Sequence, residues 1–293
     1  MRGETKIVRL ESGAEIAVAE YGDPGGAPIF FCHGWPSSRT MAEITHDAAR
    51  DLGLRIISPD RPGIRDSSFM AKRKLLDWPP VIRHLADEMR IGQFRVLGIS
   101  GGAPYAHALA WELPERVKAI AVVSGAPPIA ELETHGDLLK MYRWMLALRE
   151  SHPRLLAASF QIARPFVSAR LPLRLRPLLL KLLQPCDADV LRESRAFESC
   201  FESARQAWGG SARGVMADAE IYATPWGFSL EEIQVPVRLW HGTRDRTFSY
   251  RLAEQIAARL PNCALRMIED EGHYSTPIRH MHEILADLIS ASQ

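Results

Sequence analysis

The stretch from Val96 to Gly102 constrains the fold more than any other part of the sequence. It reads Val-Leu-Gly-Ile-Ser-Gly-Gly, so an apolar strand breaks at glycine, presents Ser100 and passes at once into the helical pattern of residues 103–112. The Gly-x-Ser-x-Gly spacing is typical of a sharp strand-to-helix turn that exposes a serine hydroxyl. A Cβ at Gly98 or Gly102 would collide with the neighbouring strand or helix. We therefore expect a nucleophile at Ser100.

A second apolar stretch leads into a loop that suits the stabilisation of negative charge. The loop reads His-Gly-Trp-Pro over residues 33–36, and its glycine and proline fix an unusual backbone path that can aim an N–H group. We expect the amides of Trp35 and Gly101 to form a two-donor oxyanion hole, at the positive end of the helix after the serine. His33 and Gly34 are expected to shape this loop, and His33 to transfer no proton.

Position selects His273 as the general base from the ten histidines. It lies between a strand-like stretch and the C-terminal helix expected over residues 277–290, at a strand's carboxyl end, where open α/β sheets collect their ligand groups. His280 and His282 are two positions apart on a helix and point in different directions, so they predict no metal site. The other histidines within helical patterns are His46, His84 and His107.

A carboxylate is needed to hold the imidazole in one tautomer and to stabilise its charged form, and Asp245 is the candidate. It follows the apolar strand pattern of residues 235–240. Asp270, close to His273 in the sequence, is the rival. The resulting chain order is serine, aspartate, histidine, which differs from the orders found in other serine-hydrolase folds.

These motifs together identify the chain as a member of the α/β-hydrolase superfamily, in the branch with a His-Gly-x-Pro oxyanion loop and a serine nucleophile. The resemblance covers nearly the whole chain and includes residues 60–67, which are similar to the family's Asp-x-x-Gly-x-Gly-x-Ser loop. Arg65 replaces the second glycine of that motif and could present a charge to the substrate. The acid motif departs as well, because Arg246-Thr247-Phe248 stands where the family often has a hydrophobic-proline pair.

Single residues separate this chain from other members of the superfamily that it resembles. Epoxide hydrolases and haloalkane dehalogenases share the oxyanion loop, but they attack with an aspartate at the position of Ser100. Proline iminopeptidases use serine, yet they typically have a bulky residue where Gly101 stands and hold the substrate's amine in a carboxylate-rich pocket. No clear source of that pocket is visible, although Glu198 and Glu202 on an expected cap helix could contribute to one.

Composition agrees with a large globular enzyme. The chain has 293 residues, of which 46% are apolar, and a formal net charge of +1 that offers no field to attract nucleic acid. Residues 1–6 lead straight into a strand pattern, so no signal segment is expected, and no apolar run of about 18 residues occurs. We expect a cytoplasmic enzyme without cofactor or metal, a monomer or homodimer that contacts neither nucleic acid nor a membrane. The cysteines, which lack metal-ligand spacing and are expected to be reduced, are Cys32, Cys186, Cys200 and Cys263.

Strand and helix patterns alternate over most of the chain, which predicts an α/β fold with a mostly parallel eight-stranded sheet flanked by helices. Strand patterns stop between residues 126 and 226, where the pattern is helical. We therefore expect an α/β-hydrolase core of residues 1–125 and 227–293, with an inserted all-helical cap, or lid, over residues 126–226. The expected strands are residues 7–10, 15–20, 28–32, 55–58, 93–99, 117–124, 235–240 and 264–268.

The expected cap would cover the site with apolar side chains and favour an apolar acyl or alcohol group. Tyr142, Trp144 and Met145 are the candidates for a substrate pocket, but for each of them we favour packing of one cap helix on another. Residues 151–185 hold six Arg or Lys and no Asp or Glu. Contact with a lipid surface or an anionic substrate is one interpretation, but we favour cap helices with solvated arginines over an apolar seam or a dimer contact.

The function that these residues predict is hydrolysis of carboxylic esters, of small to medium and largely apolar size, through an acyl-enzyme intermediate. Hydrolysis of a carbon–carbon bond and proline iminopeptidase-like activity need the same triad and stay open as alternatives. So does a ligand receptor that keeps the hydrolase fold and has little turnover, since a fold alone does not define a function.

Overall fold

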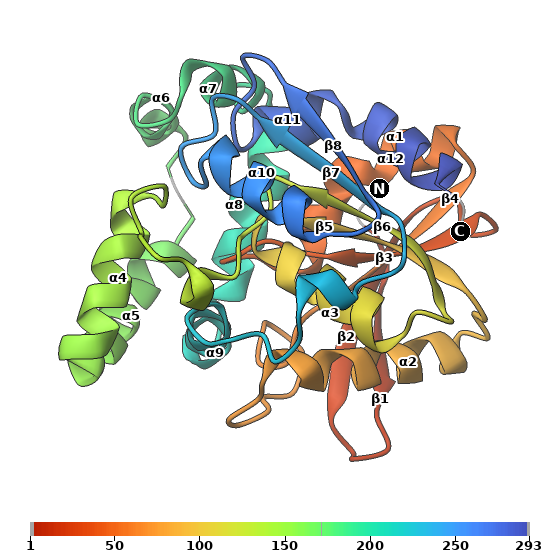
Figure 1. The fold of residues 1–293 in the computed structure, drawn as a ribbon. Coiled ribbons are helices and arrows are strands. Elements are labelled where there is room, and N and C mark those ends of the chain that lie inside the picture. The colour runs from red at the N-terminus through yellow and green to blue at the C-terminus, as the bar shows by residue number, and fades with distance from the viewer. Residues whose placement is uncertain (1–2, 171, 292–293) are drawn as a thin grey trace.

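The computed structural model describes residues 3–170 and 172–291, and its centre is a twisted sheet between helices (Figure 1). The strand order is β1-β2-β4-β3-β5-β6-β7-β8; β2 pairs antiparallel with β1 and β4, and all other neighbours are parallel. The strands are β1 Thr5–Arg9, β2 Glu15–Gly22, β3 Ala27–Cys32, β4 Leu54–Pro59, β5 Phe94–Ile99, β6 Val117–Val123, β7 Val237–Gly242 and β8 Cys263–Ile268. The predicted α/β class, with a mostly parallel eight-stranded sheet, is confirmed within the described residues.

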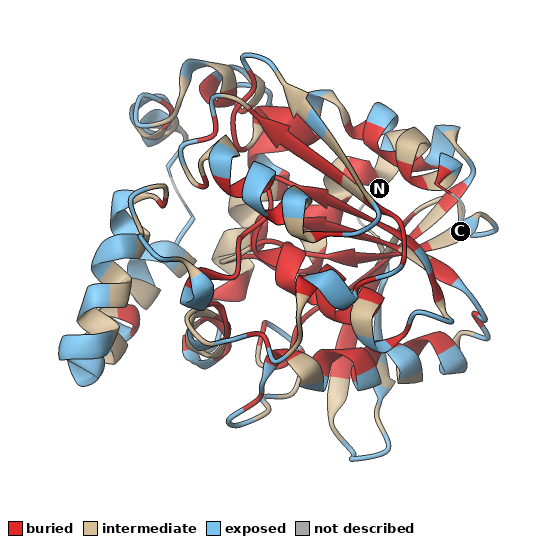
Figure 2. Cartoon of the chain, viewed as in Figure 1, coloured by how far each residue is buried: buried red, intermediate tan, exposed pale blue. Residues whose placement is uncertain are grey.

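Helices cover both faces of the sheet, because the pleat points alternate side chains of each strand to opposite sides. In β3, Phe30 packs into the cluster formed with α2 (Trp78–Glu88), α3 (Ala103–Glu112) and α10 (Tyr250–Arg259). Ile29 and Phe31 pack instead with α1 (His46–Asp51) and α12 (Met281–Ser290). The central strands are therefore buried on both sides, as the red core of Figure 2 shows. This is why they read as continuous apolar runs in the sequence.

Between β6 and β7 the described residues form helices and no strand. In Figure 1, α4, α5 and α6 project at one side of the molecule, whereas α8 and α9 lie closer to the sheet. That residues 126–226 form a separate cap domain stays a prediction. Residue 171 of that predicted cap, and residues 1, 2, 292 and 293 of the predicted core, lie outside the described residues. The inserted helices are α4 Lys140–Ser151, α5 Pro153–Ser168, α6 Arg176–Leu180, α7 Pro185–Val190, α8 Ser194–Ala207 and α9 Arg213–Tyr222.

The C-terminal helix expected over residues 277–290 is divided in the structure. It starts as α11 (Ser275–Arg279), and α12 continues after His280, whose φ of −108° and ψ of 15° lie outside the helical region. The expected helix therefore exists as a pair of shorter ones. The segment after the oxyanion loop likewise consists of two short helices, a 3-10 helix, η1 (Arg39–Thr45), and α1.

Several apolar side chains within the arginine-rich residues 151–185 are exposed to solvent, although an apolar seam would bury them. On α5, Leu155, Ile162 and Phe166 share one face at helical spacing and are 57%, 68% and 78% exposed. Phe160, on another side of the same helix, is buried. The helix thus buries only one of its apolar sides. These three residues do not lie in a buried seam, and the dimer contact expected as the other possibility stays a prediction.

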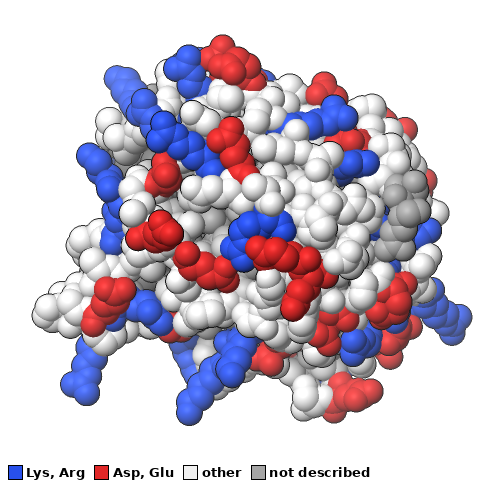
Figure 3. Space-filling model, in the orientation of Figure 1, with Lys and Arg blue, Asp and Glu red and all other residues white. Residues whose placement is uncertain are grey.

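The surface carries charges of both signs. Figure 3 shows acidic and basic side chains interspersed on the face that it draws, in keeping with the formal net charge of +1. Within the described residues, every helix is too short or too polar to cross a lipid bilayer.

Candidate active site

The serine selected from the sequence stands at the tip of a sharp turn. Ser100 follows β5 directly and takes a left-handed backbone conformation, with a φ of 54°. There is no room for a Cβ beneath the turn: at Gly102 it would lie 1.9 Å from the carbonyl oxygen of Cys32 in β3, and at Gly98 it would lie 2.9 Å from the Gly102 oxygen. The close packing therefore requires glycine at both places and holds the serine hydroxyl outside the sheet.

Ser100, His273 and Asp245 meet at one edge of the sheet, although 173 positions separate the first two. His273 Nε2 lies 2.9 Å from Ser100 Oγ, and His273 Nδ1 lies 2.8 Å from Oδ2 of Asp245. Because a carboxylate can only accept, Nδ1 carries the proton and Nε2 is left to accept from the serine hydroxyl. All three residues are buried. This arrangement can move the serine proton to the imidazole.

The loop after β7 orients Asp245. Its Oδ1 accepts hydrogen bonds from the amides of Thr247 (2.7 Å) and Phe248 (3.1 Å), which leaves Oδ2 for the imidazole. A proline at either position would lack the donor, so the departure from the family's hydrophobic-proline pair allows this bonding. Asp270, the rival acid, is exposed and pairs with Arg244.

The two ionisable partners of this site shift each other's pKa. Burial alone would lower the pKa of His273, but the neighbouring Asp245 carboxylate outweighs burial and raises this pKa above its ordinary value. Burial alone would raise the pKa of Asp245, but the charge and hydrogen bond of His273 hold it below its ordinary value. The pair therefore favours an ionised aspartate beside an imidazole that readily takes a proton.

The loop of residues 33–36 lies directly beside the nucleophile turn. A Cβ on Gly101 would be 3.0 Å from the amide nitrogen of Trp35, so the backbones of these two residues are in contact. Both residues border the cavity in front of Ser100, and the positive end of α3 lies at the same turn. The two amides expected to form an oxyanion hole are thus neighbours, and their role as donors stays a prediction.

His33 lies within this loop and is fully buried. Its Nδ1 donates to the carbonyl oxygen of Gly34 (3.0 Å), and its Nε2 accepts from the amide of Arg61 (3.4 Å). Burial and the positive charge of Arg61 hold the pKa of His33 well below its ordinary value, so the ring is neutral. Both ring nitrogens are engaged by the backbone, in keeping with the expected role of shaping the loop.

A buried cluster of charged side chains, which the sequence analysis missed, anchors the same loop. Arg61 donates to the carbonyl oxygens of His33 (2.6 Å) and Gly34 (2.8 Å), and its Nε donates to Asp218 on α9 (2.9 Å). Arg73 donates to the other oxygen of Asp218. Burial would raise the pKa of Asp218, but the two arginines lower it to about 2. The ionised Asp218 therefore fixes Arg61 in place, and Arg61 in turn anchors the oxyanion loop.

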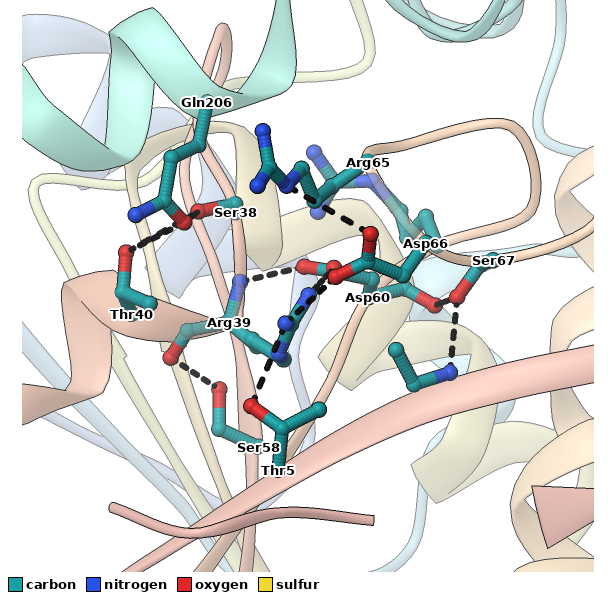
Figure 4. A network of polar contacts seen from close by, with 12 residues as sticks. Thr5, Ser38, Arg39, Thr40, Ser58, Asp60, Arg65, Asp66, Ser67 and Gln206 are labelled. Carbon is teal, nitrogen blue, oxygen red and sulfur yellow. Dashed lines mark hydrogen bonds and ion pairs between the residues drawn. The ribbon is translucent and has the colours of Figure 1, made fainter. Parts of the chain in front are cut away.

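A second polar network joins the start of η1 to α8, as Figure 4 shows. Asp60 accepts from both the amide and the guanidinium of Arg39. Gln206 on α8 accepts from the hydroxyls of Ser38 and Thr40, each at 3.3 Å. The segment that follows the oxyanion loop is therefore fixed to the inserted helices by side chains.

Arg65, which replaces a family glycine, adopts the left-handed conformation that favours glycine, with a φ of 49°. Its Nε lies 3.4 Å from Oδ1 of Asp66 (Figure 4). It is absent from the described residues that line the cavity. Its position in this structure does not support the idea that it presents a charge to the substrate.

A cavity of about 150 Å³ opens in front of Ser100. Its walls are mainly apolar and come from α4, α5, α9 and loops of the core, with Met145, Leu156 and Phe248 among them. Arg149 and Glu220, joined by an ion pair, border it where their side chains reach solvent. The cavity can therefore take an apolar group next to the serine hydroxyl.

Two of the three pocket candidates line this cavity. Tyr142 and Met145, three positions apart on α4, share its inner face. Trp144 is 56% exposed and is not among the described lining residues, so the expectation for it was wrong. It lies about 200° around the helix from Tyr142. Neither Glu198 nor Glu202 lines the cavity in the described part of the chain, which therefore has no carboxylate-rich pocket there.

Comparisons with known proteins agree with the fold. The sequence matches the family model described as alpha/beta hydrolase fold over residues 27–276, so the chain belongs to the α/β-hydrolase family. A bromoperoxidase from Bacillus anthracis aligns with 98% of this chain and 99% of its own, at 18% identity and a TM-score of 0.71. An esterase from Exiguobacterium antarcticum aligns with 98% of both chains, at 16% identity and a TM-score of 0.70. Likeness at such identities shows the fold alone.

Curated relatives match shorter parts of the chain. The uncharacterised hydrolase YcgS of Bacillus subtilis is 29% identical over 125 residues, which is 42% of each chain. An epoxide hydrolase of Caballeronia sordidicola is 30% identical over 112 residues, 37% of this chain and 33% of its own. The chain thus spans less than half the length of these relatives. Together with the family match, the names support a hydrolase of the α/β family and no particular substrate.

Replacing Asp218 should destabilise the protein strongly. In Asp218→Asn the buried Arg61 and Arg73 lose their counter-charge, and we expect the free energy of unfolding to fall by about 3–5 kcal/mol. Urea unfolding followed by circular dichroism measures this. The matched control is Glu220→Gln, also on α9, whose ion pair with Arg149 is solvent-exposed and contributes at most about 1 kcal/mol.

The lowered pKa of Asp218 makes the difference in unfolding free energy between wild type and Asp218→Asn depend on pH. Since the folded state holds the pKa of Asp218 at about 2, below its ordinary value, the difference between wild type and Asp218→Asn should be complete above about pH 5. It should shrink as the pH falls toward 2. Equal unfolding free energies for the wild type and Asp218→Asn at neutral pH would contradict the buried ion cluster.

Proposed function

We propose that the protein is a serine hydrolase that cleaves carboxylic esters through an acyl-enzyme intermediate. The observation that carries this proposal is the line of contacts from Ser100 Oγ to His273 Nε2, at 2.9 Å, and from His273 Nδ1 to Asp245, at 2.8 Å. A nucleophile, a base and a carboxylate that orients the base are the groups that acyl transfer needs.

The proposed reaction has two steps. Ser100 Oγ attacks the ester carbonyl carbon while His273 Nε2 takes its proton, and the amides of Trp35 and Gly101 bind the oxyanion that forms. His273 then returns the proton to the leaving alcohol, which gives the acyl-enzyme. A water molecule, deprotonated by His273, attacks the acyl carbon in the second step and releases the acid and free Ser100. Asp245 stays ionised and stabilises the imidazolium.

The lining of the cavity suits a substrate that carries an apolar group. Its mainly apolar walls favour a hydrocarbon acyl or alcohol part of the substrate. The epoxide hydrolase relative suggests a different substrate class, but the aspartate expected as its nucleophile is replaced by Ser100 here. The absence of a carboxylate-rich pocket among the described lining residues favours ester cleavage over release of an N-terminal residue.

Two alternatives need the same three residues: hydrolysis of a carbon–carbon bond, and a ligand receptor with little turnover. A screen of esters with graded acyl length, run beside dienoate and diketone substrates with products identified by mass, distinguishes carbon–carbon bond hydrolysis from ester hydrolysis. Labelling by a fluorophosphonate without multiple turnovers would favour the receptor.

Ser100→Ala should nearly abolish turnover while the fold is kept, because loss of the nucleophile in such a site costs several orders of magnitude in kcat. Hydrolysis of a short-chain aryl ester and labelling by a fluorophosphonate measure this. The control is Ser159→Ala on α5, whose hydroxyl donates to the carbonyl oxygen of Leu156 in the same helix. If Ser100→Ala kept more than about a tenth of the activity, Ser100 would not be the nucleophile.

The rate should depend on the protonation of His273. Since Asp245 raises the pKa of His273 and only the neutral ring accepts a proton, kcat/KM should fall on the acid side of a pKa above the ordinary value for imidazole. Asp245→Asn should move this limb to lower pH and reduce kcat by roughly 10³ to 10⁴. An acid limb that stays in place in this variant would contradict the assignment of Asp245.

Neighbouring residues of α4 offer a test of the substrate pocket. Met145→Ala should enlarge the cavity and raise kcat/KM for longer acyl chains relative to shorter ones by about tenfold, since one methylene is worth about 1–3 kcal/mol in a pocket. Trp144→Ala, its neighbour on the exposed side of the helix, should leave this ratio unchanged. The same change in both variants would mean that the cavity is not the acyl site.

A further inference from the structure

A buried carboxylate from the inserted helices contacts the loop that carries His273. Asp187 lies on α7 and is 4% exposed. Its Oδ2 accepts from the amide of His273 (3.2 Å), and its Oδ1 accepts from the amides of Tyr274 (2.8 Å) and Ser275 (2.9 Å). Three successive amides of one loop therefore donate to the same side chain, which lies 86 positions before His273 in the sequence.

The loop is built around this carboxylate. A Cβ on Gly272 would lie 2.6 Å from the oxygens of Asp187, so only glycine lets the acid approach. The amide of Gly272 donates to Ser275 Oγ (2.7 Å), and Thr276 Oγ1 donates to the Gly272 oxygen (2.6 Å). The amide and the carbonyl oxygen of Gly272 are thus satisfied within the loop. Removing the carboxylate would leave buried amides without an acceptor.

These bonds act on the part of His273 that determines where its ring lies. The ring has to reach Ser100 through Nε2 and Asp245 through Nδ1 at once, so its backbone can move little without losing one of the two contacts. Misplacing a reacting group by about 1 Å can cost roughly a hundredfold in rate. A second negative charge behind the loop also favours the protonated ring.

The charged and titratable groups around His273 come from several elements. Asp245 and His241 face it from β7 and the loop that follows, and Tyr274 is its neighbour in the chain. Tyr142 of α4 stacks on Phe248, whose ring packs against His273. Asp187 is the acid on the side of the inserted segment, and together with Asp245 it raises the pKa of His273.

We propose that Asp187 is a positioning residue for His273, through which the inserted helices hold the base in its reactive orientation. The inference rests on the proposed function, since it assigns a role in the same reaction. It gives α7 a role in supporting the base through the backbone of the loop that carries His273.

The test compares two substitutions of Asp187 with one of its neighbour. Asp187→Ala removes every acceptor, whereas Asp187→Asn keeps the shape but loses the charge and turns a donor toward one amide. The control is Asp189→Asn, on the same helix, whose carboxylate also reaches α11 but through a surface ion pair with Arg279 (2.9 Å). Thermal unfolding shows which variants are folded.

The kinetic readouts are kcat, KM and the pH profile with an aryl ester. We expect kcat to fall by about a hundredfold in Asp187→Ala and about tenfold in Asp187→Asn, with KM nearly unchanged because the cavity is intact. The acid limb of kcat/KM should move to lower pH in Asp187→Asn and stay in place in Asp189→Asn. A folded Asp187→Ala with wild-type kcat and an unmoved acid limb would overturn the proposal.

Two further measurements separate this proposal from that of ester cleavage. The rate at which a fluorophosphonate labels Ser100, and the titration of the His273 ring followed by NMR, both report on the base without an ester substrate. If the wild type hydrolyses no ester but both readouts change in Asp187→Asn, the positioning role stands and the proposed function fails. If esters are hydrolysed and neither readout changes, the positioning role fails and the proposed function stands.

Discussion

Parallel pairing of the central strands is the constraint on which the rest of the structure depends. β3, β5, β6 and β7 run in one direction, so their carboxyl ends meet at a single edge of the sheet. The loop of residues 33–36 follows β3, Ser100 follows β5 and Asp245 comes soon after β7. Groups from distant parts of the chain share one space because the hydrogen-bond register places these ends side by side.

The inserted helices hold the loops at this edge by specific polar contacts. Asp218 fixes Arg61 below the oxyanion loop, and Asp187 binds the amides of the His273 loop. Tyr222 of α9 donates to the carbonyl oxygen of Gly101 (2.8 Å). The oxyanion loop (through Arg61), the turn at Ser100 and the loop of His273 are thus bonded to groups between α7 and α9. Buried ionised groups are costly to leave unpaired, so the core and these helices depend on each other for their arrangement.

Local patterns in the sequence predicted much of this arrangement. The helix of residues 103–112 has the expected bounds, and the strands begin and end within a few residues of the expected ones. The choice of Trp144 failed because adjacent positions on a helix point to different sides, so a run of large side chains cannot all face one cavity. Whether the exposed apolar face of α5 contacts a second copy of the chain stays a prediction, because a periodic apolar face shows that a helix is amphipathic but not what covers it.

The sequence alone determined the class of fold, the turn at Ser100 and three groups able to form a triad. These depend on apolar periodicity, on glycine where a Cβ has no room and on positions after strands, all of which are readable within short windows. Only the tertiary structure decided which distant carboxylates support the site. Arg61 and Asp218 are 157 positions apart, and nothing in the spacing of two charged residues in separate elements shows that folding will bury them against each other. Such pairs are selected by the energy of burying charge, which exists only once the chain has folded.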